Sequence, residues 1–207
     1  MRMKISLKAT GKRYNYEWIF RNLDFTFQSD KSYAILGANG SGKSTLLQVI
    51  AGNIIPSTGE IFYHENENTI EPENFYQYIT IASPYLELPE EMTLQELLHF
   101  HSGFKKFKSQ LSFSDMIELS GFGKSSTRQI KHYSSGMKQR AKLMLAILSD
   151  TPVLLLDEPT TNLDEQGVQW WKNLMNEYAK NRLVIIASNI EREYDNCDEK
   201  ILIADYK

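Results

Sequence analysis

The sequence has 207 residues, a formal net charge of −3, 42% hydrophobic and 24% charged residues. This length and composition fit one soluble α/β domain with a sizeable core, and the weakly acidic charge argues against a nucleic-acid partner, which needs a clustered basic surface. The one cysteine, Cys197, cannot form an internal disulfide and has no histidine at ligand spacing, so we expect no metal or catalytic role for it.

The first third of the chain predicts strands followed by one helix. Apolar and polar residues alternate over 5–7 and 19–27, which indicates an N-terminal β region. An apolar run at 33–36 predicts a buried strand, and the glycine-rich stretch 37–42 after it leads into a helix that ends near Gly52.

The middle of the chain predicts mostly helix after two short strands. Strands are expected at 60–63 and 77–82, with a polar loop over 64–74 between them. Thr93 and Glu96 have the Thr-x-x-Glu form of a capping box that opens a helix. A second helix is expected at 114–120, with a stop at Gly121.

The last third predicts alternating helices and apolar strands. Ser134 has the character of a helix N-cap. Further elements are a strand at 153–156, a helix at 164–180, and strands at 183–187 and 200–203. Because continuous apolar strands alternate with helices, we expect a mostly parallel core sheet covered on both faces. The expected organisation is one domain, 1–207, with a helical subdomain inserted at about 84–150.

The sequence contains no apolar run near the ~20 residues that span a bilayer, and the stretch 1–7 does not read as a signal peptide. We therefore expect a cytoplasmic protein that reaches the inner face of the cell membrane only through a partner.

Residues 37–44 match the phosphate-binding pattern G-x-x-x-x-G-K-[ST] between a predicted strand and a predicted helix. Glycines let backbone N–H groups converge on one anion, and the helix N-terminus adds positive charge. Lys43 is expected to hold the β- and γ-phosphates of ATP, and the Ser44 hydroxyl to ligate Mg²⁺. The candidate nucleotide-binding residues are Gly37, Asn39, Gly40, Ser41, Gly42, Lys43, Ser44 and Thr45. The alternative is a glycine-rich turn that matches by chance.

Two acids follow the apolar strand at 153–156. Ligands of open α/β sheets gather at the carboxyl ends of strands, so Asp157 is expected to hold Mg²⁺, directly or through water, and Glu158 to orient or deprotonate the attacking water. Without the glycine-rich loop, such a pair is as readily a helix cap or a loop. Together the two motifs predict a P-loop NTPase fold.

A third segment narrows the class. Tyr133-Ser134-Ser135-Gly136-Met137-Lys138-Gln139-Arg140 resembles the ABC (ATP-binding cassette) signature, of which Ser134 and Gly136 match while Tyr133, Ser135 and Met137 are substitutions. The stretch 159–164, after the acids, looks like the segment that ends in the D-loop of that family. The motif order is preserved over essentially the whole chain.

The resemblance implies an ATP-binding and ATP-hydrolysing subunit of an ABC transporter. It implies a head-to-tail homodimer or heterodimer, with ATP between one chain's P-loop and the other chain's Ser134 and Gly136. It also implies a separate transmembrane permease subunit, contacted near 83–92. For the segment around Ser134 alone, the alternative is an ordinary capped core helix.

The family also stacks adenine on an aromatic residue before the P-loop. Tyr14 lies where that residue is expected, and Tyr16 and Trp18 are nearby candidates for the same role. The alternative is that the aromatic side chain only packs against its neighbours.

Two positions depart from the family pattern. Ser83 stands in the place of a glutamine that touches Mg²⁺, and Asn189 stands in the place of the switch histidine. Asparagine can donate a hydrogen bond to the γ-phosphate but cannot become cationic or accept a proton as imidazole does. We therefore expect normal ATP binding and slow hydrolysis.

Other functional classes stay open on the sequence. They are a regulatory nucleotide-sensing subunit, a soluble ABC ATPase that acts on DNA or ribosomes, and a P-loop kinase. A P-loop kinase would leave the segment 133–140 unexplained. A soluble ABC ATPase that acts on DNA or ribosomes usually needs a long heptad insertion or a second cassette.

Overall fold

The computed structural model describes residues 2–29 and 31–207 of the chain. The chain forms two compact units, and each is considered by itself. The first comprises Met1–Ile81, Pro152–Glu158 and Asn181–Lys207, and the second comprises Ala82–Thr151 and Pro159–Lys180. The expected single domain with an insertion over 84–150 stays a prediction.

The first unit contains an antiparallel sheet of strand order β2-β1-β4-β5. Its strands are β1 (Met3–Tyr14), β2 (Glu17–Gln28), β4 (Thr58–Glu65) and β5 (Asn68–Ile70). Ile5 lies opposite Phe27 on one side and Tyr63 on the other, and all three are almost completely buried. The alternation in the sequence therefore reflects one buried face, as expected for an antiparallel sheet.

The polar stretch 64–74, predicted to be a loop, is not entirely one. Asn66 adopts a left-handed conformation, φ 54°, and turns β4 back into β5, where Ile70 pairs with Tyr63. A 3-10 helix, Pro72–Tyr78, follows, so strand β6 (Ile79–Ala82) starts two residues later than expected. Ile70 is 6% exposed, and the burial of its side chain stabilises β5, whose other residues are polar.

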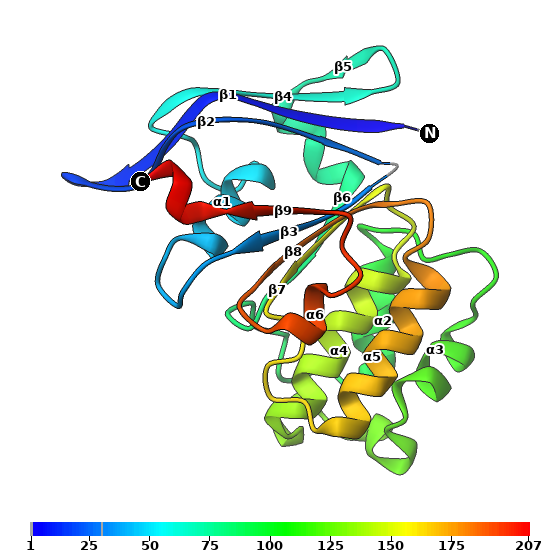
Figure 1. The fold of residues 1–207 in the computed structure, drawn as a ribbon. Coiled ribbons are helices and arrows are strands. Elements are labelled where there is room, and N and C mark those ends of the chain that lie inside the picture. The colour runs from blue at the N-terminus through cyan, green and yellow to red at the C-terminus, as the bar shows by residue number, and fades with distance from the viewer. Residues whose placement is uncertain (1, 30) are drawn as a thin grey trace. The chain divides into compact units, whose positions relative to one another are not determined.

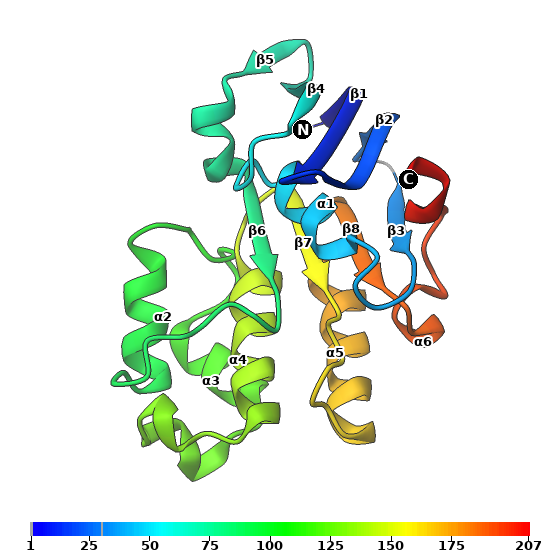
Figure 2. The same ribbon diagram turned by 90° about the vertical axis from the view of Figure 1, so that its left-hand side faces the viewer.

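A second sheet of the order β6-β7-β8-β3-β9 forms the core. Its remaining strands are β7 (Val153–Asp157), β8 (Leu183–Ser188), β3 (Ser32–Leu36) and β9 (Glu199–Leu202). The pairs β7–β8 and β8–β3 (Figure 2) and the pair β3–β9 are parallel, which confirms the predicted fold class. Because β8 lies between β7 and β3, the residues after these three strands meet at one edge.

Helix α1 (Lys43–Ile50) joins this core through one apolar face. Leu46, Leu47, Val49 and Ile50 are all 0% exposed. Truncating one such leucine to alanine costs about 2–5 kcal/mol, so the buried face fixes the helix to the core.

The second unit is helical. Its helices are α2 (Leu94–Ser102), α3 (Phe113–Ser120), α4 (Ser135–Leu148) and α5 (Glu165–Tyr178) (Figure 1). The capping box of Thr93 and Glu96 is present at α2, and the left-handed Gly121, φ 68°, ends α3. Among residues 2–29 and 31–207, no helix combines the length and apolarity that crossing a bilayer requires.

Candidate functional site

The glycine-rich loop runs from the end of β3 to the start of α1. Gly42 is the N-cap of α1 at φ 107°, and a Cβ added there would lie 2.2 Å from Ile19 Cγ2. Only glycine fits this position without rearrangement. Within the described chain no side chain caps α1, so its first backbone amides are available to an anion.

Lys43 is held inside this loop. Its side chain is 4% exposed, and its Nζ donates hydrogen bonds to the carbonyl oxygens of Gly37 at 2.9 Å and Ala38 at 3.1 Å. The loop therefore encloses an ammonium group next to backbone amides, which is the donor set that a polyphosphate needs.

Ser44 and Asp157 come together across the core. Ser44 Oγ donates to Asp157 Oδ1 at 3.0 Å, and Asp157 is 1% exposed at the end of β7. Hydroxyl and carboxylate oxygens suit Mg²⁺, which keeps several waters and uses few protein ligands. In the described part of the chain, no group of three or more His, Cys, Asp or Glu is arranged to hold a metal ion.

Glu158 follows Asp157 in a left-handed conformation, φ 43°. Its N–H donates to the Ala187 carbonyl of β8 at 2.9 Å. A non-glycine residue at positive φ stores backbone strain of about 1–3 kcal/mol, and such strain concentrates at functional sites. The strand pairing holds Glu158 in this conformation beside the Ser44–Asp157 pair.

Asn189 follows β8 and reaches the glycine-rich loop. The last residue of β8, Ser188, pairs with Leu36 of β3, so Asn189 emerges beside the start of the loop. Its Nδ2 donates to Asn39 Oδ1 at 2.9 Å. No local pattern in the sequence indicates this contact.

The first unit thus assembles the predicted phosphate, metal and acid residues at one end of the core sheet: Gly37, Asn39, Gly40, Ser41, Gly42, Lys43, Ser44, Thr45, Asp157, Glu158 and Asn189. Tyr14 ends β1 with 48% of its side chain exposed and Lys12 Nζ 5.2 Å from its ring centre. Tyr16 is 96% exposed, and the Trp18 ring lies 5.6 Å from the Arg13 guanidinium. Of the three aromatic candidates, Tyr14 is the one that ends β1, and it is about half exposed.

The comparisons with known proteins give the family. The family model described as ABC transporter matches residues 20–161, more than half of the chain. The chain belongs to the ABC transporter family. The uncharacterised ABC transporter ATP-binding protein YxlF of Bacillus subtilis is 30% identical over 203 residues, which are 96% of this chain and 67% of that protein. ABC ATPases bind ATP, normally with Mg²⁺, and family membership implies ATP hydrolysis.

Two solved ABC structures share the fold. A putative ABC transporter ATP-binding protein from Pyrococcus furiosus superposes with a TM-score of 0.81 at 19% identity, over 99% of each chain. A dimeric bacterial ABC transporter cassette has a TM-score of 0.79 at 20% identity, over 96% of this chain and 94% of its own.

The segment 133–140, which resembles the ABC signature, lies in the second unit. Ser134 is the N-cap of α4, and its Oγ accepts the Met137 N–H at 3.2 Å, as the sequence predicted. A Cβ added to Gly136 would lie 2.8 Å from the backbone oxygen of Asn162, which has φ 65°. Glycine at 136 therefore permits close approach between the start of α4 and the backbone at Asn162.

Ser83 lies in the same unit and is 2% exposed. Lys142 of α4 donates its Nζ to the carbonyl oxygens of Ser83 at 3.1 Å and Pro84 at 2.9 Å. This lysine fixes the start of the segment expected to meet the permease, and sequence reasoning missed it because no local pattern marks it. Tyr85, the next residue, is 80% exposed.

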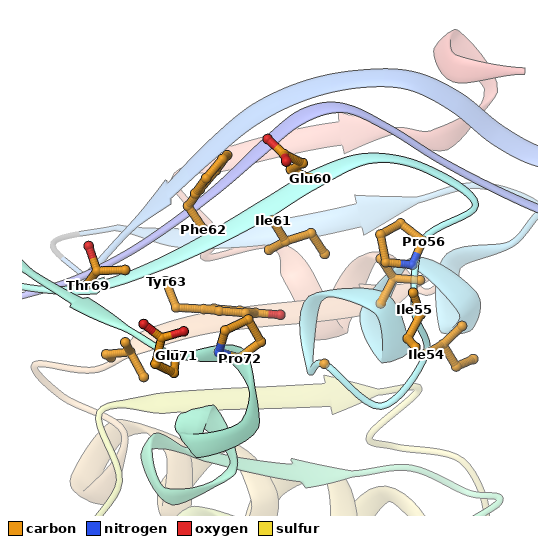
Figure 3. A pocket seen from close by; sticks show the side chains of 13 residues that line it. Ile54, Ile55, Pro56, Glu60, Ile61, Phe62, Tyr63, Thr69, Glu71 and Pro72 are labelled. Carbon is orange, nitrogen blue, oxygen red and sulfur yellow. The ribbon is translucent and has the colours of Figure 1, made fainter.

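A separate cavity of about 460 Å³ lies in the first unit between the end of α1 and the β4–β5 hairpin (Figure 3). Ile61 and Tyr63 of β4 line it, together with Ile54 and Pro56 of the loop after α1. Its described lining residues include two acids, Glu60 and Glu71, and no lysine, arginine or histidine.

Proposed function

We propose that this chain binds ATP with Mg²⁺ at the glycine-rich loop, hydrolyses it slowly, and uses ATP-dependent pairing to drive a separate membrane subunit. The Ser44–Asp157 hydrogen bond at 3.0 Å carries the proposal. It joins the phosphate-loop helix to the acidic strand end in the arrangement that a shared cation needs.

Each residue has a defined part in this proposal. Lys43 binds the β- and γ-phosphates, and amides of the loop from Gly37 to Thr45 surround them. Ser44 and Asp157 hold Mg²⁺, which when bound neutralises charge that develops on the phosphate oxygens. Glu158 orients or deprotonates the attacking water. Tyr14, which is about half exposed, stacks on adenine.

The slow turnover follows from two substitutions. Asn189 contacts the γ-phosphate through an amide, which cannot carry the charge of an imidazolium. Ser83 has too short a side chain to replace a glutamine at the metal. The groups that bind the phosphates are retained, so affinity for ATP is expected to be normal.

Pairing of two nucleotide-binding chains would complete the site. Helix α4 has 14 residues and presents Ser134, Gly136 and the positive end of its dipole to a γ-phosphate held by the other chain. Support comes from the fold shared with a cassette that was solved as a dimer. Pairing with a copy of itself and pairing with a related chain both satisfy this geometry.

The membrane partner is proposed to be a transmembrane permease subunit at the inner face of the cell membrane. The segment 83–92 would contact it, because Tyr85 and Leu86 expose apolar surface there while Lys142 holds the segment's first carbonyl groups. The transporter name of the family supports this assignment.

The deciding experiment compares the wild type with Glu158→Gln in Mg²⁺ and ATP, measuring phosphate release and particle mass. We expect the variant to bind ATP, to release phosphate at least ~100-fold more slowly, and to accumulate as a dimer. Glu118→Gln, an exposed acid of α3, is the control. An unchanged rate in Glu158→Gln contradicts the proposed role of this acid.

The same measurement tests the alternative that this chain is a regulatory, nucleotide-sensing subunit. The observation that favours this alternative is the asparagine at position 189. Such a subunit would bind ATP and pair without measurable phosphate release in the wild type. Co-purification with a membrane protein, abolished by Tyr85→Asp, would support transport.

A further inference from the structure

One buried acid of the first unit has no part in the proposed function. Glu193 lies on the short helix α6 (Glu191–Tyr194) and is 3% exposed. Its carboxylate accepts a hydrogen bond from Ser188 Oγ, and Ser188 is 0% exposed. A buried carboxylate costs several kcal/mol unless it is hydrogen-bonded, so this pair constrains where the chain runs.

The Ser188 hydroxyl fixes both sides of the turn that carries Asn189. Its hydrogen is donated to Glu193, and one of its lone pairs accepts the N–H of Ile190 at 2.9 Å. The Glu193 N–H in turn donates to the Ile190 carbonyl at 3.0 Å. Residue 189 is therefore held between two anchored neighbours.

The direction in which this turn points is set by the sheet. Ser188 lies opposite Leu36, the last residue of β3 before the glycine-rich loop. The Asn189 side chain crosses from there to Asn39. Asn189 itself is exposed, so packing does not hold it, and its position depends on the backbone on either side.

We propose that Ser188 and Glu193 are positioning residues for hydrolysis, which act by holding the turn after β8 so that the Asn189 amide faces the phosphate loop. This inference rests on the proposed function. Without the Ser188 hydroxyl, the Ile190 N–H loses its acceptor, Glu193 loses a donor, and the turn gains conformational freedom. A misplacement of about 1 Å at a reacting group can cost up to ~100-fold in rate.

The test measures kcat and KM for phosphate release from ATP with Mg²⁺ in the full chain. Ser188→Ala, which removes one oxygen atom, is expected to lower kcat roughly tenfold and to leave KM within about twofold. Ser188→Thr keeps the hydroxyl and should restore most of kcat. Glu191→Gln, an exposed acid on the same helix, is the control and should behave as the wild type.

A double-mutant cycle separates positioning from general stability. Because Ser188 acts through Asn189, Ser188→Ala should cost no further rate when Asn189→Ala is already present. Additive losses overturn the inference, as does a rise of KM at constant kcat. If Ser188→Ala does not fold, Glu193→Ala takes its place in the cycle with the same expected outcome.

Failure of the inference is distinct from failure of the proposed function. If the wild type neither binds nor hydrolyses ATP, the proposed function fails and the inference falls with it. If the wild type turns over and Ser188→Ala keeps its kcat, only the positioning role is refuted.

Discussion

Asn189 Nδ2 donates a hydrogen bond to Asn39 Oδ1 at 2.9 Å, across 150 positions of the sequence. The two asparagines belong to different strand ends, one after β8 and one after β3, which are neighbours in the core sheet. The contact places a neutral amide next to the loop that is proposed to hold the phosphates.

This contact leads to a prediction for Asn189→His. An imidazole at this position can carry charge and accept a proton, so phosphate release should rise, by roughly tenfold, with little change in ATP affinity. Steady-state rates at saturating ATP check it, with Asn66→His, at the exposed hairpin turn, as the matched control. A rate no higher than that of the wild type would argue against the assignment of Asn189.

Removing the ammonium group of the loop should weaken nucleotide binding. In Lys43→Ala the charge-assisted contacts to phosphate are lost, which corresponds to roughly 10- to 100-fold weaker affinity for ATP with Mg²⁺. Calorimetric titration measures this. Lys124→Ala removes an exposed lysine of the second unit and should bind as the wild type does; equal affinities in both variants would refute the phosphate site.

Gly136→Ala should strain the start of α4. The added Cβ would lie 2.8 Å from the backbone oxygen of Asn162, too close for either backbone to stay in place. We expect a loss of about 1–3 kcal/mol in unfolding free energy and a loss of ATP-dependent pairing, with ATP affinity retained. Denaturant titration and particle mass in ATP measure the two effects.

Gly103→Ala provides the comparison for that variant. Its added Cβ would meet Phe100 O at 3.3 Å, a contact that a small shift relieves. The prediction for Gly136 fails if the two alanine variants are equally stable and pair equally well.

His101 should make the stability of the chain depend on pH. Burial, and then the charge of Lys105, lower the pKa of His101 from 6.5 to about 4, and His101 Nε2 lies 2.8 Å from Ser149 Oγ. Between these two pKa values the unfolded chain binds a proton that the folded chain does not. The contribution of His101 to the stability of the folded chain is therefore complete above pH 6.5, and it is lost as the pH falls toward 4.

The measurement is the urea midpoint at pH 7 and at pH 5. His101→Gln should lose less stability over this interval than the wild type, because its side chain does not titrate. His132→Gln, which changes an exposed histidine, should keep the wild-type dependence. The same loss of stability in all three proteins would exclude His101 as the source.

Much of the local structure could be predicted from the sequence because its causes lie within a few residues. Thr93 and Glu96 form the capping box of α2, and Gly121 ends α3 with a positive φ. Ser134 caps α4 because its Oγ accepts the N–H of the residue three positions later. These signals depend on side chain to backbone contacts inside one turn. The pattern from Gly37 to Ser44 likewise needs only a strand before it and a helix after it.

The sequence determined a phosphate loop and two acids after a buried strand, since each pattern is local and chemically specific. Only the tertiary structure decided that Ser44 is hydrogen-bonded to Asp157 and that Asn189 is hydrogen-bonded to Asn39. The tertiary structure also brings the buried Glu193 to Ser188, at the turn that carries Asn189. It also decided that the polar stretch after β4 contains a strand, through the burial of Ile70. These outcomes depend on which strands become neighbours in a sheet, and that order is set by the packing of the whole core rather than by any stretch of local sequence.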